Sequence, residues 1–361
     1  MRNVLVTGGA GFIGSNFVRF LLEREPNVRV VNLDALTYAG SLENLKDLPD
    51  PDRYAFVHGD IRDFGTVAGV FRQHAIDTVV HLAAESHVDR SILNPAPFIQ
   101  TNVLGAFNLL EAARQAWDGS GGNPAEGFRF LHVSTDEVFG SLGPDAPPFS
   151  ETTPYAPNSP YAASKAASDH LVRAYARTYQ LPAIITNCSN NYGPFQFPEK
   201  LIPLMILNAV EGRGLPIYGD GQQIRDWLHV QDHCDGLWRA LVDGRPGETY
   251  NFGGGVQHSN LGLVQQICSH LDHFLPDSPS CPHASLITLV ADRPGHDRRY
   301  AMDITKARRE LGWAPRRTLE DGLRTTVSWY LEHSEWIEAI RNRPSYQDWL
   351  RENYGMRGMS A

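Results

Sequence analysis

The sequence predicts an α/β protein, with a Rossmann-like doubly wound parallel sheet and a smaller C-terminal substrate-binding lobe. Short, continuous apolar runs alternate with segments of helical apolar spacing over the first half of the chain. A glycine-rich turn directly follows the first apolar run. Strands that are apolar throughout are typical of parallel sheets covered by helices on both faces. The alternation fades after about Asn190, where Pro, Gly and aromatic residues become frequent and the second lobe is expected to begin.

The predicted strands are the apolar runs, and the predicted helices lie between them. Strands are expected at 4–6, 28–33, 55–57, 78–83, 128–133 and 183–186. Helices are expected at 15–23, 66–74, 102–117 and 160–179. We therefore divide the chain into a dinucleotide-binding domain at 1–189 and a lobe at 190–361, with segments near 229–252 (a helix, then a strand at 249–252) returning to the first domain.

The composition excludes several classes of protein. Acidic residues number 41 and basic residues 32, and the resulting net charge of −9 disfavours nonspecific nucleic-acid binding. No apolar run approaches the roughly 18 residues that span a bilayer, so no membrane partner is expected. The N-terminus reads as a strand and not as a signal peptide, which predicts a cytoplasmic protein. The four cysteines form no C-x-x-C pair and the histidines are scattered, so no metal site is expected.

The glycine turn after the first strand predicts a dinucleotide site. Gly8, Gly11 and Gly14 form a G-x-x-G-x-x-G variant of the dinucleotide fingerprint, which permits a tight turn, close approach of a pyrophosphate and close helix packing. The helix N-terminus that follows offers N–H donors to phosphate, and Phe12 and Ile13 lie in this turn. Asp34 ends the second strand, 20 residues after Gly14. An acidic residue there accepts hydrogen bonds from a ribose and repels a 2′-phosphate, which favours NAD over NADP.

Asp60 and Ile61 follow the third predicted strand and have two interpretations. They are placed to contact adenine, and Asp60 could equally be an ordinary helix N-cap.

A tyrosine and a lysine share one face of a predicted helix. Tyr161 and Lys165 are four residues apart, after Ser159 as the expected N-cap and Pro160 as the first helical residue. Lys165 is one of only four lysines, against 28 arginines. A general base near neutral pH needs the tyrosine pKa lowered from about 10 to about 7. We expect Lys165 and the positive end of the helix to lower it.

The glycine turn and Tyr161-x-x-x-Lys165 together resemble the extended short-chain dehydrogenase/reductase family, whose members act on sugar nucleotides. The resemblance covers nearly the whole chain, from Val4 to about Tyr354. It implies that Tyr161 deprotonates a sugar hydroxyl while hydride passes to NAD, and that Lys165 holds the nicotinamide ribose. Thr135 matches the third member of the family's catalytic triad. Members of the family are usually homodimers, so a homodimer is expected.

Asp136 and Glu137 follow the predicted strand at 128–133. By themselves they read as solvated carboxylates in a strand-end turn. The stretch from His132 to Val138 is, however, similar to the nucleotide-sugar 4,6-dehydratases within this family. That resemblance implies oxidation at C4, removal of the C5 proton by Glu137, assistance by Asp136 in loss of the C6 hydroxyl as water, and return of hydride to C6. Phe139 stands where Tyr is common in the family, and we expect it to affect packing only.

Further residues are assigned by the same resemblance. The backbone after the fourth strand, with Ala83 and Ala84, is expected to line the cofactor. Glu85 or Ser86 is expected to reach the hexose. Asn191 is expected at the nicotinamide. The remaining substrate-binding residues, expected around the diphosphate and the base, are Asn190, Lys200, Leu201, Pro216, Tyr218, Arg225, Asn260, Arg293 and His296. Arginine suits phosphate because its fork of donors can pair two oxygens.

The resemblance leaves the substrate partly open. The favoured interpretation is a lyase that converts dTDP-glucose into its 4-keto-6-deoxy product, feeding rhamnose or another deoxysugar. The same chemistry on a UDP-, CDP- or GDP-linked hexose is an alternative. An epimerase or decarboxylase on this scaffold, or a non-catalytic NAD sensor, is less favoured, because Asp136, Glu137, Tyr161 and Lys165 are all present.

Overall fold

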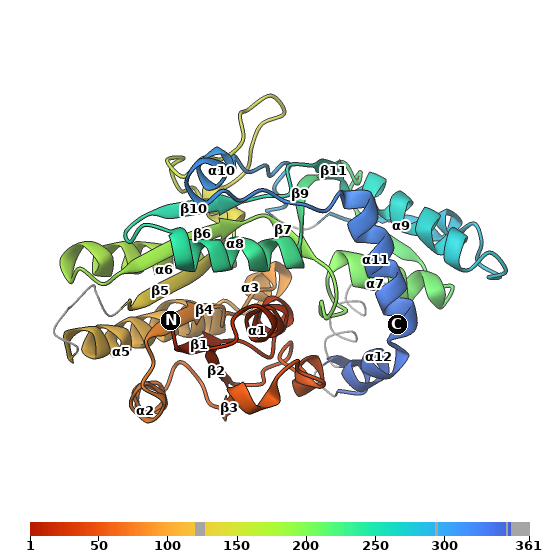
Figure 1. Cartoon of the computed structure of the whole chain (residues 1–361). Helices are drawn as coiled ribbons and strands as arrows, with labels where there is room; N and C mark the ends of the chain where they lie inside the picture. Colours follow the sequence, from red (N-terminus) through yellow and green to blue (C-terminus); the bar gives the residue numbers. More distant parts are fainter. Residues whose placement is uncertain (120–126, 293–294, 344–345, 348–361) are drawn as a thin grey trace.

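A seven-stranded sheet forms the centre of the computed structural model, which describes residues 1–119, 127–292, 295–343 and 346–347 (Figure 1). Every pairing in this sheet is parallel. The strand order β10-β6-β5-β4-β1-β2-β3 reverses direction between β1 and β4. The strands are β1 (Asn3–Thr7), β2 (Arg29–Asp34), β3 (Tyr54–His58), β4 (Thr78–His81), β5 (Arg129–Thr135), β6 (Ala183–Cys188) and β10 (Thr249–Phe252). This confirms the predicted Rossmann-like fold.

The alternation of side chains along each strand explains why the strands are apolar throughout. Val4 and Val6 of β1 belong to a core beneath α1 (Phe12–Arg24) and α8 (Val230–Asp243). Leu5, between them, points to the opposite core. That second core packs against α2 (Phe64–His74), α5 (Ala106–Gly119) and α6 (Pro160–Thr178). Because successive side chains point to opposite faces, a sheet covered on both sides needs apolar residues at every position.

The second half of the chain builds smaller sheets at one end of the molecule (Figure 1). One has the order β11-β9-β7 and the other pairs β12 with β8. These strands are β7 (Asn190–Tyr192), β8 (Leu215–Tyr218), β9 (Ile224–His229), β11 (Gln257–Ser259) and β12 (Ile287–Val290). A third core packs β7, β8, β9 and β12 against helices α7 (Leu201–Val210), α9 (Asn260–Phe274), α11 (Leu319–Glu332) and α12 (Ser334–Arg341). The helix α10 (Thr305–Leu311) contacts β10 and α8 instead.

The helix expected at 102–117 is not a single α-helix. After the short α3 (Val88–Leu93) and α4 (Ala96–Phe98), residues Ile99–Gly105 form a π-helix that continues into α5. Apolar spacing does not reveal such a bulge, because it changes the hydrogen-bond register and not the residue types. Among the helices that the structure describes, none has the length and apolar character to span a bilayer.

An aromatic contact anchors strand β10, and a substitution at this contact tests the packing of the strand. Phe252 is fully buried, and its ring lies 4.7 Å from that of Trp313 and against Gly236 of α8. We expect Phe252→Ala to lower the free energy of unfolding by about 3–5 kcal/mol, because a large cavity opens between β10 and α8. Denaturant titration measures this. The matched control Leu289→Ala, at an exposed position in β12, is expected to change it by no more than about 0.5 kcal/mol. An equal loss in both variants would contradict this account of the packing.

Candidate active site

One cavity lies where the strands of the large sheet end at their carboxyl edge. Its walls come from the turn after β1, the ends of β2, β4, β5 and β6, the first turns of α6, and the segment before α7. In open parallel sheets, ligands bind at this edge beside the point where strand order reverses. The cavity therefore lies where the fold predicts a ligand.

The glycine turn leaves space that a side chain would fill. Gly8 has φ +71°, and a Cβ built on it would lie 2.7 Å from the backbone of Ala83. A Cβ on Gly14 would lie 2.1 Å from the carbonyl oxygen of Gly8, so α1 packs on the turn as only glycine allows. Gly11 is the N-cap of α1 and supplies no side chain to the first N–H groups. The residues present thus fit the pyrophosphate of a dinucleotide.

Asp34 lies in the cavity wall at the end of β2. Its carboxylate accepts hydrogen bonds from the backbone N–H groups of Ala10 and Leu36, both at 2.8 Å. Burial raises the pKa of Asp34, and these two N–H donors oppose the change. The carboxylate is therefore held in a fixed orientation beside the glycine turn, as a ribose-binding residue requires.

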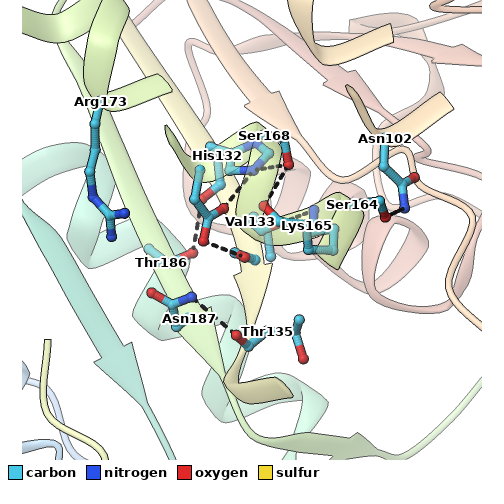
Figure 2. Close-up of polar contacts among 12 residues, drawn as sticks. Asn102, His132, Val133, Thr135, Ser164, Lys165, Ser168, Arg173, Thr186 and Asn187 are labelled. Atoms are coloured by element: carbon cyan, nitrogen blue, oxygen red, sulfur yellow. Dashed lines mark hydrogen bonds and ion pairs between the residues drawn. The ribbon is translucent and has the colours of Figure 1, made fainter. Parts of the chain in front are cut away.

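Tyr161 and Lys165 both line the cavity and are almost entirely buried. Ser159 caps α6 as predicted, accepting a hydrogen bond from the N–H of Ala162 at 3.1 Å. Lys165 Nζ donates to the carbonyl oxygen of Val133 in β5 at 2.7 Å (Figure 2). The ammonium group is thereby fixed between α6 and β5.

The prediction that the pKa of Tyr161 is lowered is wrong for the protein without bound ligands. Burial, and then the charge of Glu137, hold the pKa of Tyr161 well above its usual value, although a hydrogen bond with Thr135 opposes them. Burial lowers the pKa of Lys165, and the charge of Asp169 opposes that change. The spacing of residues in the sequence does not show how strongly Tyr161 is desolvated. This desolvation raises the tyrosine pKa by more than the positive helix terminus is expected to lower it.

Asp136 and Glu137 occupy different environments although they are adjacent. Asp136 is 2% exposed, and burial together with the charges of Glu137 and Asp226 holds its pKa well above the usual value. Glu137 is half-buried and lines the same cavity. Thr135 Oγ1 orients the turn, because it accepts from the N–H of Glu137 at 3.3 Å and donates to Asp136 at 3.2 Å. Burial thus favours the protonated form of Asp136, which suits an acid.

Most of the other sequence-predicted site residues meet in this cavity. Lys200 Nζ donates to the backbone carbonyl of Ser86 at 3.3 Å, which joins two predicted substrate residues. The N-cap of α2 is Asp63 and not Asp60, so the capping interpretation of Asp60 is wrong. The further predicted residues that line the cavity are Phe12, Ile13, Asp60, Ile61, Ala83, Ala84, Glu85, Asn190 and Asn191.

A second group of predicted residues does not line the cavity. Arg225 donates to the carbonyl of Asp297 at 2.9 Å, and the ring of Tyr218 lies 6.1 Å from that of His296. Tyr218 and His296 thus meet in the second lobe, and Arg225 bonds the residue that follows His296. The role of these three residues toward a substrate stays a prediction. The same holds for Leu201, Pro216 and Asn260. Arg293 lies outside the described residues.

Two residues that the sequence analysis missed hold the predicted ones in place. Asn102, in the π-helix, bonds both backbone groups of Glu85 and donates to Ser164 Oγ at 2.8 Å (Figure 2). His233 Nδ1 lies 2.9 Å from Asn191 Oδ1, and burial lowers the pKa of this histidine to about 3, so the ring is neutral. Both lie far from their partners in sequence, and no local pattern marks them.

Glu199 also lines the cavity, and its carboxylate pairs with Arg90 at 3.2 Å. Glu199 was not singled out by the sequence analysis. Its position directly before Lys200, a predicted substrate-binding residue, is the feature of the sequence that could have identified it.

Comparison with known proteins agrees with this geometry. The model of the GDP-mannose 4,6 dehydratase family matches residues 5–326. A dTDP-glucose 4,6-dehydratase from Shigella flexneri is 56% identical over 359 residues, covering 97% of this chain and 98% of the relative. The structure of such an enzyme from Streptomyces venezuelae, solved with NAD and dTDP, matches with a TM-score of 0.84 and 49% identity, over 94% of this chain and 99% of that one. One from Bacillus anthracis, in complex with NAD, matches with a TM-score of 0.82 and 44% identity over 94% and 100%.

The fold and the site together define a protein of the extended short-chain dehydrogenase/reductase class. Within that class, the chain belongs to the GDP-mannose 4,6 dehydratase family of nucleotide-sugar dehydratases.

The packing of α1 on the glycine turn gives a direct test of the dinucleotide site. We expect Gly14→Ala to weaken NAD binding roughly tenfold or more, because the added Cβ must push α1 away from Gly8. Calorimetric titration with NAD measures this. The control is Gly69→Ala in α2, where a Cβ meets nothing within 4 Å and helix stability is expected to rise by up to about 1 kcal/mol. Unchanged affinity in Gly14→Ala would argue against this binding site.

Proposed function

We propose that the protein is an NAD-dependent hydro-lyase that converts dTDP-glucose into dTDP-4-keto-6-deoxyglucose. The observation that carries this proposal is the meeting of two pairs in one cavity: Tyr161 with Lys165, and Asp136 with Glu137. The first pair suits oxidation of an alcohol, and the second suits removal of water next to the resulting ketone. The high identity to dTDP-glucose 4,6-dehydratases over nearly the full chain supports the choice of substrate.

NAD is the cofactor that fits the cradle formed by the glycine turn and Asp34. When bound, NAD accepts hydride from C4 of the sugar and gives it back at C6. Asp34 favours a free ribose over a 2′-phosphate. Lys165 would hold the nicotinamide ribose, and Asn191, oriented by His233, would contact the nicotinamide. Because burial keeps the pKa of Tyr161 high, the positive charge of the oxidised nicotinamide would have to help this phenol lose its proton.

The chain's own residues then divide the proton transfers. Tyr161 removes the proton of the C4 hydroxyl as the C4–H bond breaks, and Thr135 orients the phenol. Glu137 removes the C5 proton, which the new C4 ketone makes acidic, and a proton returns to C5 from Glu137 when hydride adds to C6. Asp136 gives its proton to the C6 hydroxyl, so that the C6–O bond breaks and water leaves. The raised pKa of Asp136, caused first by burial, supports this assignment.

The remaining site residues keep their predicted roles as proposals. Asn190 and Lys200 would contact the diphosphate, with Glu85 or Ser86 at the hexose. Arg225, Tyr218, His296, Asn260, Pro216, Leu201 and Arg293 would act around the diphosphate and base. The division of the chain at 189/190 is likewise proposed, supported by separate cores for the large sheet and the smaller ones. Cytoplasmic location and the supply of a deoxysugar such as rhamnose stay predictions.

We further propose that the protein is a homodimer, joined through the segment from α3 to α5. Five large apolar side chains are exposed along this one segment, the most open being Leu93 at 60% and Leu104 at 54%. The others are Ile92, Ile99 and Phe107. A run of exposed apolar residues of this kind is typical of a surface that another protein covers.

The reaction can be tested by mass spectrometry of purified protein incubated with dTDP-glucose, UDP-glucose, CDP-glucose and GDP-mannose, without added NAD. We expect loss of one water from dTDP-glucose alone. Loss of water from another sugar nucleotide would support the proposed mechanism but assign the enzyme a different substrate. No change in any substrate, with or without added NAD, would overturn the proposal.

Glu137→Gln separates proton removal from oxidation. We expect dehydration to fall roughly 100-fold or more, because the C5 base is lost. Oxidation at C4 is expected to persist, seen as NADH absorbance after substrate is added. Incubation in deuterated water should show no deuterium at C5. Full activity in this variant would reassign the base.

The dimer proposal predicts that Leu104→Asp yields monomers in sedimentation velocity runs, because a buried charge without a partner is costly at an interface. Leu289→Asp, at another exposed leucine, is the matched control and should leave the dimer intact. A monomeric parent protein, or a dimeric Leu104→Asp variant, would overturn the proposed interface.

A further inference from the structure

A carboxylate that plays no part in the proposed chemistry lies buried behind the active site. Asp169 is 0% exposed and follows Lys165 by four residues in α6, so both project from the same face of the helix. Asp169 does not line the cavity, although Lys165 does. An ionised carboxylate in such a place is costly unless donors and an opposite charge compensate for the lost water.

The donors around Asp169 keep it ionised. Its Oδ2 accepts from Ser134 Oγ at 2.9 Å and from the hydroxyl of Tyr155 at 2.8 Å. Tyr155 in turn accepts from Arg173 Nη2 at 2.7 Å. His132 Nε2 lies 3.1 Å from Oδ1. Burial raises the pKa of Asp169, but its interaction with His132, then the charge of Lys165 and the hydrogen bond from Tyr155, hold the pKa below its usual value.

The histidine in this cluster is not a second cation. Burial and the charge of Lys165 lower the pKa of His132, so its ring is neutral near pH 7. Burial likewise holds the pKa of His81 well below its usual value, so this ring, 5.2 Å from that of His132, is also neutral. The thiol of Cys188, which faces Lys165 from β6, has its pKa raised by burial to about 12 and carries no charge. The opposite charges that act on each other in this buried cluster are therefore the ammonium of Lys165 and the carboxylate of Asp169.

The same contacts fix the strand that bears the acid and the base. His132 and Ser134 belong to β5, and Lys165 and Asp169 belong to α6. Figure 2 shows His132, Ser168 and Lys165 in this layer between strand and helix, with Arg173 further along α6. Displacement of α6 relative to β5 would move Tyr161 away from Thr135 and the two residues after it.

We propose that Asp169 is a positioning residue: its buried carboxylate is the counter-charge that keeps Lys165 an ammonium ion, and its contacts with β5 hold the Tyr161–Lys165 pair against the acid and base. The proposal rests on the proposed function, because it gives Lys165 a catalytic task. Without Asp169, the desolvated ammonium would lose its proton at lower pH and would no longer favour deprotonation of Tyr161. Tyr161, Asp136 and Glu137 line the same cavity as Lys165. Arg173 reaches Asp169 only through Tyr155, to which it donates.

The variant Asp169→Asn tests this in the purified holoenzyme. We expect kcat for dehydration at pH 8 to fall roughly 10- to 100-fold, a part of the usual contribution of a general base. KM is expected to stay within about threefold, because Asp169 does not line the cavity. The alkaline limb of the pH profile is expected to move to lower pH by about one pH unit or more. A fall in kcat with an unmoved pH profile would indicate a merely structural role and overturn the proposal.

Two variants separate charge from structure. Tyr155→Phe removes a donor to Asp169 and leaves its charge, so the alkaline limb should stay in place. A shift as large as that in Asp169→Asn would contradict the proposal. Asp272→Asn is the matched control, because Asp272 also contacts a buried histidine, with 2.6 Å to His283 Nδ1, but lies in α9 of the second lobe. It should leave kcat and the pH profile unchanged.

A second measurement does not depend on activity. The chain has only four lysines, Lys46, Lys165, Lys200 and Lys306, so protein labelled with ¹³C at lysine Cε gives four signals that substitution to Arg can assign. In the parent holoenzyme, the Lys165 signal should be that of an ammonium ion at pH 8, and in Asp169→Asn it should titrate at lower pH. A neutral Lys165 in the parent at pH 8 would overturn the proposal even if the variant failed to fold. A parent that dehydrates no nucleotide sugar would instead refute the proposed function.

Discussion

The contact between α6 and β5 is the constraint on which the active site depends. The hydrogen bond from Lys165 Nζ to the carbonyl of Val133 joins the helix that carries the tyrosine to the strand that ends at Thr135. Every proposed proton transfer takes place within a few residues of this joint. Because β5 lies inside the large sheet and α6 packs its buried face against that sheet, the surrounding layers hold the joint in one geometry.

Burial is the main influence on the chemistry of the site. It favours the neutral forms of Asp136, of Tyr161 and of Lys165 alike. For Asp136 a neutral carboxyl is useful, since an acid must hold its proton until the hydroxyl leaves. For Tyr161 and Lys165 the neutral form is unfavourable for catalysis, so nearby charges must favour the ionised form of each. The site thus combines one group for which desolvation helps with two for which it must be opposed.

The sequence contained most of the fold and only part of the site. Continuous apolar runs located the strands of the large sheet, because burial on both faces leaves a pattern that is visible locally. Tyr161 and Lys165 were predictable because helical spacing brings them together. Asn102 and His233 were not, since each acts on a residue distant in sequence. The tyrosine pKa was misjudged because desolvation depends on layers of structure that spacing does not describe.

The return of β10 to the large sheet has a consequence for biosynthesis. Strand β6 pairs with β5 on one side and with β10 on the other, and β10 follows β6 by a long excursion through the second lobe. A ribosome delivers the chain from its N-terminus, so the first six strands of this sheet emerge while the edge of β6 still has open backbone groups. Such an edge can pair with other chains. A nascent chain would therefore remain prone to aggregation until residues 249–252 have left the ribosome, when most of the protein has already been made.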